Sequence, residues 1–245
     1  MIRIQTSKDL AIVLAAVLAA AAAAPAVAQF PESDDTPGDE GLGVELGLSV
    51  AEETAVAEES GLSLTGGIGT DLSLPDEAES LLEIQELIGQ KHLTDALKKA
   101  DALLDAYPFS LSTKVAKAVI LTELFRYREA LDILNLLMER YPDDAAIMNN
   151  IAWIYATADD PTVRNGDRAV ELGQYALLRA PGSYHIWSTM AEGYYVSGNY
   201  ERALKAATEA MRMAVRQKAS SENLREYREQ LTKSYLAVEA LSLLD

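Results

Sequence analysis

The strongest constraint on this chain is an internal repeat in its C-terminal two thirds. One series of landmarks consists of alanines spaced by 34, 39 and 34 residues: Ala96, Ala130, Ala169 and Ala203. A second series, at the ends of the same segments, shows the same three spacings: Pro108, Pro142, Pro181 and Val215. Two independent landmarks therefore share one period and one insertion. Self-similarity of this kind is typical of proteins built from stacked repeats.

The clearest copies of the repeat place large residues at helical spacing, followed by small ones. The last copy carries Trp187, Met190, Ala191, Tyr194, Gly198, Tyr200, Ala203, Ala207 and Ala210. The copy before it carries Met148, Ile151, Ala152, Tyr155, Ala169, Ala176 and Pro181. This pattern resembles the tetratricopeptide repeat (TPR), a helix–turn–helix unit. The resemblance implies an all-α solenoid of about four repeats, at 77–110, 111–144, 145–183 and 184–217.

The spacing of small residues has a packing explanation. Ala152 and Ala169, and again Ala191 and Ala203, are expected where two antiparallel helices cross, because small side chains let the backbones approach. A single hairpin cannot bury its apolar face alone, so neighbouring repeats must stack. Proline ends the second helix of the first three repeats. Val215 stands at the fourth of these positions, and we expect that helix to continue past it.

Residues 218–245 are predicted to form a capping helix. Their apolar positions recur every three or four residues, which defines one helical face: Leu224, Tyr227, Leu231, Tyr235, Val238 and Leu241. Solenoids need terminal elements with a polar outer face. A coiled-coil arm is the alternative, but the segment is shorter than three full heptads.

The N-terminus has the organisation of an export signal. Arg3 and Lys8 precede an unbroken apolar run from Leu10 to Ala24, and small residues follow up to Ala28. This arrangement is typical of a secretory signal peptide. It predicts cleavage after Ala28 and a location in the periplasm or outside the cell. The run is shorter than the roughly 20 residues of a comfortable membrane span, and an uncleaved N-terminal anchor is the alternative.

Residues 29–76 are predicted to be a disordered acidic linker. Residues 29–80 contain 14 Asp or Glu and no Lys or Arg, and eight of the chain's 14 glycines lie in 29–75. Such a segment cannot bury enough apolar surface to offset chain entropy. One stretch has the alternation of a strand: Leu42, Val44, Leu46, Leu48 and Val50. It could add to the edge of a partner's sheet.

Composition excludes several classes of function. The chain has 245 residues, 38 acidic and 21 basic, and a net charge of −17, which argues against nucleic-acid binding. No cysteine is present, and the two histidines lie in different repeats. The insertion at 159–167 contains aspartates but lacks the calcium-loop pattern. No nucleophile–base motif is recognisable, so we expect no cofactor, no metal and no enzymatic activity.

The TPR resemblance also implies where a partner binds. TPR arrays present a concave groove lined by the first helix of each repeat. Helical register places nine residues near this face: Ser112, Val115, Val119, Asn149, Asn150, Trp153, His185, Glu192 and Tyr195. Chaperone-binding members of the family clamp a carboxylate with basic residues here, whereas the matching positions of this chain carry Val115, Asn149, Trp153 and His185. We therefore predict that Asn149, Asn150, Trp153, His185, Glu192 and Tyr195 hold an apolar or extended segment.

Two functions remain open on the sequence. The first is a non-enzymatic protein–protein interaction scaffold or adaptor in the cell envelope, with envelope-assembly or secretion proteins, or the chain itself, as partners. The second is a membrane-tethered assembly subunit of an envelope or secretion complex, which requires the N-terminal segment to remain uncleaved. No membrane span is expected after cleavage, because the chain has no second long apolar run.

Overall fold

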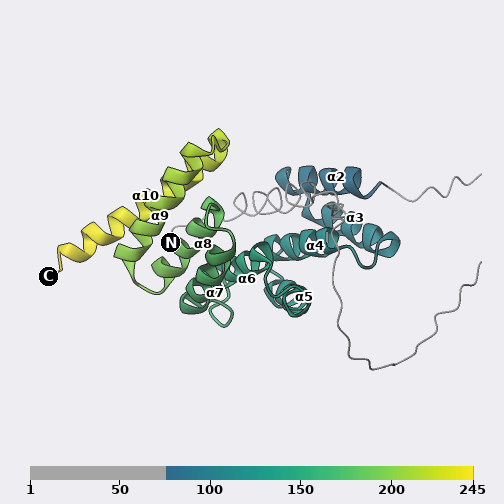
Figure 1. Cartoon of the computed structure of the whole chain (residues 1–245), viewed down its shortest axis with the longest axis horizontal. Helices are drawn as coiled ribbons and strands as arrows, with labels where there is room; N and C mark the ends of the chain where they lie inside the picture. Colours follow the sequence, from purple (N-terminus) through teal and green to yellow (C-terminus); the bar gives the residue numbers. More distant parts are fainter. Residues whose placement is uncertain (1–75, 245) are drawn as a thin grey trace, which may run out of the picture. The chain divides into compact units, whose positions relative to one another are not determined.

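A computed structural model describes residues 76–244, and this part of the chain is all-α (Figure 1). Its helices are α2 (Glu77–Gly89), α3 (Leu93–Ala106), α4 (Leu111–Glu123), α5 (Tyr127–Arg140), α6 (Ala145–Thr157), α7 (Gly166–Arg179), α8 (Tyr184–Val196), α9 (Tyr200–Arg216) and α10 (Ser221–Ser242). The expected signal peptide and nearly all of the expected linker lie outside the described residues. Asp76, the last residue of that linker, is the N-cap of α2. Within 76–244, none of the helices has the length and hydropathy needed to span a membrane.

Local sequence signals account for about half of the helix ends in the described residues. The N-cap side chain of six helices accepts a hydrogen bond from a backbone N–H of the first turn: Asp76, Ser110, Asp144, Asn165, Asn199 and Ser220. Helices α3, α5 and α7 each end two residues before a proline. Helix α9 ends at Arg216, one residue past Val215, and has 17 residues where α3, α5 and α7 have 14.

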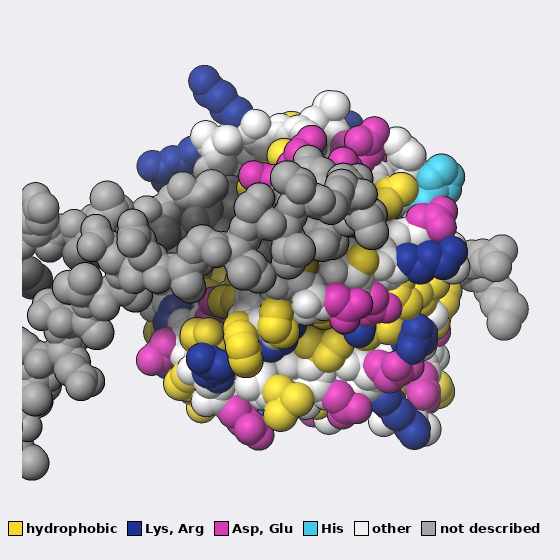
Figure 2. Space-filling view, turned by 90° about the vertical axis from the view of Figure 1, so that its right-hand side faces the viewer, with side chains coloured by type: hydrophobic (Ala, Val, Ile, Leu, Met, Phe, Trp, Pro, Cys, Tyr) yellow, Lys and Arg dark blue, Asp and Glu magenta, His cyan; other side chains and the backbone are white. Residues whose placement is uncertain are grey.

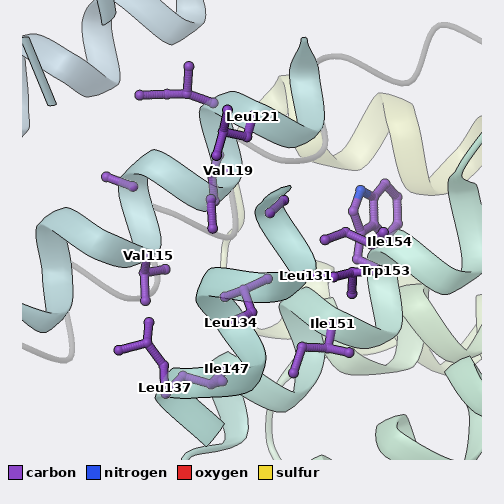
Figure 3. Packing of buried hydrophobic residues seen from close by; sticks show 14 of the residues in the cluster. Val115, Val119, Leu121, Leu131, Leu134, Leu137, Ile147, Ile151, Trp153 and Ile154 are labelled. Atoms are coloured by element: carbon purple, nitrogen blue, oxygen red, sulfur yellow. The ribbon is translucent and has the colours of Figure 1, made fainter. Parts of the chain in front are cut away.

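Each helix packs against the next along the chain, and α2, α4, α6 and α8 also contact one another in that order. The predicted crossing residues Ala152, Ala169, Ala191 and Ala203 are all fully buried. Core side chains of α4, α5 and α6 point toward one another (Figure 3). The core has two clusters. The larger one is rich in Leu, Ile and Val, whereas the smaller one, around α8 and α9, is made largely of alanine and methionine.

Three of the residues expected near the groove belong to the larger cluster: Val115, Val119 and Trp153. Val115 and Val119 are each 1% exposed and pack within the larger cluster. Helical register placed them correctly on the first helix of the second repeat. It did not reveal that neighbouring helices close over this face, because burial there depends on side chains distant in sequence.

Helices α7 and α8 approach closely through glycines that the sequence did not single out. A Cβ atom on Gly166 would lie 2.5 Å from the carbonyl oxygen of Gly193, and a Cβ on Gly193 would lie 3.2 Å from the Cβ of Ala169. A side chain at position 166 would therefore require the backbone to move, whereas one at position 193 would require its neighbours to give way by a few tenths of an ångström. Gly166 had been placed in the inserted loop, but it is the first residue of α7.

The inserted loop between α6 and α7 is tied to its own repeat. Val163 is buried, and the Arg164 guanidinium donates to the carbonyl oxygens of Ala158 and Asp159. The backbone N–H of Asn165 donates to the carbonyl of Tyr155. These contacts hold the loop against the end of α6.

Helix α10 packs on α9 and also contacts α8. Of the predicted apolar stripe, Tyr227 is buried, whereas Tyr235 and Leu241 are 54% and 46% exposed. Two polar residues of α10, Gln230 and Ser234, are buried instead. Within the described residues, one face of the protein shows acidic and basic side chains intermixed, with hydrophobic side chains between them (Figure 2).

Candidate functional site

The candidate site is an open pocket of about 310 Å³ where α6, α8, α9 and α10 meet the inserted loop. Its lining combines aromatic, small and charged side chains: Trp153, Ala156, Thr157, Asp159, Arg164, Glu192, Tyr195, Val196, Tyr200 and Lys233. Three of the six residues predicted for the groove, Trp153, Glu192 and Tyr195, therefore lie together on its wall.

The aromatic part of the pocket comes from three helices. Trp153 on α6 is largely buried, with 4% of its surface exposed, so most of the indole packs in the core. Tyr195 on α8 and Tyr200 on α9 are half-buried, with their ring centres 5.2 Å apart. Burial, with Tyr200 and Glu192 nearby, raises the pKa of the Tyr195 hydroxyl, which stays neutral. This wall offers stacking surface and hydroxyl groups.

A cluster of charged and polar side chains in the pocket is built by α8 and α10. The Lys233 ammonium donates to both carboxylate oxygens of Glu192, at 2.8 and 2.6 Å. The Gln230 amide donates to the same carboxylate at 2.9 Å and to the Ser188 carbonyl at 3.0 Å. Glu192 is thus fully engaged by the C-terminal helix, and α10 forms one side of the pocket.

The predicted asparagines do not lie on the surface. Asn149 and Asn150 are each 3% exposed. The Asn150 amide donates to the Ala146 carbonyl one turn earlier, at 3.0 Å. The side-chain oxygens of both residues are buried without a hydrogen-bond partner among the described residues. Helical register predicts a groove position for both asparagines, whereas the structure buries their side chains.

His185 lies apart from the pocket, under α10. A hydrogen bond of 2.9 Å joins its Nδ1 to the Tyr227 hydroxyl, and its ring lies 4.1 Å from that of Tyr184, centre to centre. Burial lowers the pKa of the imidazole from 6.5 to about 4. A neutral, covered histidine here anchors the C-terminal helix.

Comparison with known proteins identifies the family. The family described as "Psidin, N-terminal TPR repeats region" matches residues 80–221. The chain belongs to this TPR family. A chain of known structure titled "MamA 41-end from Desulfovibrio magneticus RS-1" is similar at 13% identity, with a TM-score of 0.44, over 69% of this chain and 98% of that chain. No curated protein matches the chain.

The TPR register located only part of the pocket. Ala156 and Thr157 follow Trp153 by three and four residues, so helical periodicity could have placed them on the same face. Helical periodicity could not place three other charged and aromatic residues on this face, because they come from other elements. Tyr200 lies on α9, Arg164 on the inserted loop and Lys233 on α10. Among the described residues, no group of three or more His, Asp or Glu side chains could hold a metal ion.

The covered histidine makes stability depend on pH. In the unfolded chain an imidazole binds a proton near pH 6.5, whereas folded His185 does so only near pH 4. The unfolded state therefore binds more protons between these values, and the stability contributed by this group is lost as the pH falls. Between pH 7 and pH 5 we expect a loss of about 2 kcal/mol from His185.

Glu123 acts in the opposite direction. Burial raises the pKa of its carboxyl from 4.5 to about 7 despite the attraction of Lys91, whose ammonium lies 3.1 Å away. Its contribution to stability is therefore largest at low pH and is lost as the pH rises through 7.

The His185 effect is consequently measured as a difference, by urea denaturation of the wild type and His185→Gln at pH 5 and pH 7. Equal pH dependence of the two proteins would contradict the burial of a neutral imidazole.

Proposed function

We propose that this TPR protein is a non-enzymatic interaction scaffold that binds an extended segment of a partner protein in the pocket between its third and fourth repeats. The observation that carries the proposal is the convergence of Trp153, Tyr195 and Tyr200 on one open pocket. Aromatic rings provide large contact area with polar edges, a combination enriched at protein interfaces. Membership in the TPR family supports a protein as the partner.

Crosslinking from position 195 tests this function. A photoreactive amino acid replaces Tyr195 in cells, and mass spectrometry identifies both the partner and the crosslinked segment. A matched probe replaces Tyr175, an exposed tyrosine on α7 that does not line the pocket. We expect one partner segment to crosslink from 195 and not from 175. The same products from both positions would contradict a binding pocket.

Tyr195→Ala should weaken binding of the identified segment by about 1–3 kcal/mol, the usual effect of removing an interface anchor. The free energy of unfolding should change little, because Tyr195 is only half-buried. Isothermal titration of the synthetic segment measures the effect, with Tyr175→Ala as the control. If Tyr195→Ala binds normally and removal of residues 29–75 abolishes binding, the acidic segment is the binding element instead.

We further propose that the scaffold is exported to the cell envelope or beyond, with cleavage after Ala28. The organisation of residues 1–28 supports this location. Deleting them should retain the protein in the cytoplasm, as judged by cell fractionation, and an unchanged distribution would refute the signal. N-terminal sequencing of the exported protein separates a cleaved scaffold, which begins at Gln29, from the alternative of a tethered assembly subunit that keeps residue 1.

A further inference from the structure

The ammonium group of Lys233 already occupies part of the pocket. Its nitrogen lies 4.2 Å from the centre of the Tyr195 ring and donates to both carboxylate oxygens of Glu192. The two charged side chains are only 25% and 14% exposed. Attraction between a cation and an aromatic face strengthens as water is excluded, and ionic hydrogen bonds are the stronger class. This point of the pocket therefore suits a positive charge.

The rest of the pocket lining also offers aromatic rings and a carboxylate. Trp153 and Tyr200 add two aromatic rings. Within residues 76–244, the Asp159 carboxylate has no ion-pair partner within 4.0 Å. Arg164 is the other cation of the lining, and two of its nitrogens donate to backbone carbonyls rather than to a carboxylate. Without Lys233, two carboxylates would face one guanidinium, so the pocket would carry a net negative charge.

We propose that the pocket receives a lysine or arginine side chain of the bound protein segment, at the position now held by Lys233. The proposal rests on the proposed function, because it specifies which side chain the segment places in that pocket. Lys233 is then an intrachain substitute for the partner's cation. A ligand displaces its ammonium toward solvent, which the flexible four-carbon stem permits. Helix α10 itself stays in place, since Gln230 and Tyr227 hold it to α8.

Two peptides that differ only in the ammonium group test the proposal. A capped tripeptide with a central lysine and its norleucine counterpart are titrated separately into the full chain. NMR follows the indole signal of Trp153 and the ring signals of Tyr195. We expect the lysine peptide to bind about two- to thirtyfold more tightly than the norleucine peptide, the range of cation–aromatic attraction.

Lys233→Met is expected to strengthen binding of the lysine peptide about two- to tenfold, because the ligand no longer competes with an internal cation. Binding of the norleucine peptide should not gain. Lys205→Met is the matched control, since Lys205 is exposed on α9 and outside the pocket. It removes the same charge and should leave both affinities unchanged. An unchanged or weaker affinity of Lys233→Met for the lysine peptide would overturn the proposal.

A double variant keeps the test valid if Lys233→Met folds poorly. Glu192→Gln with Lys233→Met removes both charges, and it should lose most of the preference for lysine over norleucine. A preference equal to that of the wild type would refute the role of the carboxylate. Equal binding of the two peptides to the wild type overturns the cation proposal and leaves segment binding intact. If neither peptide binds, the cation proposal falls, and crosslinking from position 195 decides the proposed function independently.

Discussion

Replacing Trp153 with alanine is expected to lower the free energy of unfolding by about 3–5 kcal/mol, the usual cost of removing a large aromatic side chain from a core. The indole is 4% exposed and belongs to the larger core cluster (Figure 3). Its removal leaves a cavity on α6 that the surrounding helices can close only in part. Urea denaturation followed by circular dichroism at 222 nm, a probe of helix content, measures the change.

Trp153→Phe is the matched control for this variant. Phenylalanine keeps an aromatic ring in the cluster and should lose less than half as much stability. A loss of no more than about 0.5 kcal/mol in Trp153→Ala, the scale of a surface substitution, would mean that the indole is not a core residue. The pocket would then have a mobile wall, and its binding role would need a different anchor.

Ala191→Leu is expected to destabilise the protein by about 3 kcal/mol, the upper part of the range for overpacking. Ala191 is fully buried in the smaller cluster, where α8 meets its neighbours. Three added carbon atoms must push apart helices that approach through alanine and glycine. The alanines of this cluster have no side chain that could move aside, so the added volume is taken up only by its methionines or by a shift of the backbone.

The control for overpacking is Ala102→Leu on the exposed face of α3. The same three carbons reach solvent there, and the free energy of unfolding should change by no more than about 0.5 kcal/mol. Thermal and urea denaturation of the two variants give the comparison. A neutral Ala191→Leu would place the fourth repeat out of register with the other three.

Helical register predicted some of the pocket residues but not their exposure. Trp153 and Glu192 occupy equivalent positions in the first helices of successive repeats, and Tyr195 follows Glu192 by about one turn. Side-chain direction along the 3.6-residue period therefore predicts that the three share a face. The same reasoning predicts Asn149, Asn150 and His185 on that face. These three are not open to solvent there, because exposure depends on neighbouring helices: the structure buries both asparagines and covers His185 with Tyr227.

The close packing of α7 on α8 shows a second limit. Gly166 lies in the insertion at 159–167 and follows an asparagine, a pair typical of turns. The structure uses the absence of a side chain at this position to bring the α7 and α8 backbones together. Whether a glycine serves a turn or a close approach depends on what lies opposite, and the sequence around it is the same in either case.

The sequence by itself determined the all-α class, the repeat period and the ends of the helices that precede a proline, because proline and apolar periodicity act within one or two turns of a helix. Only the tertiary structure decided which groove positions stay open and which charges line the pocket. Lys233 reaches Glu192, and Tyr227 reaches His185, from about 40 residues away along the chain. Contacts at that separation depend on how α10 packs against α8 and α9. That packing depends on the side chains along whole helices, so a short stretch of sequence does not predict it.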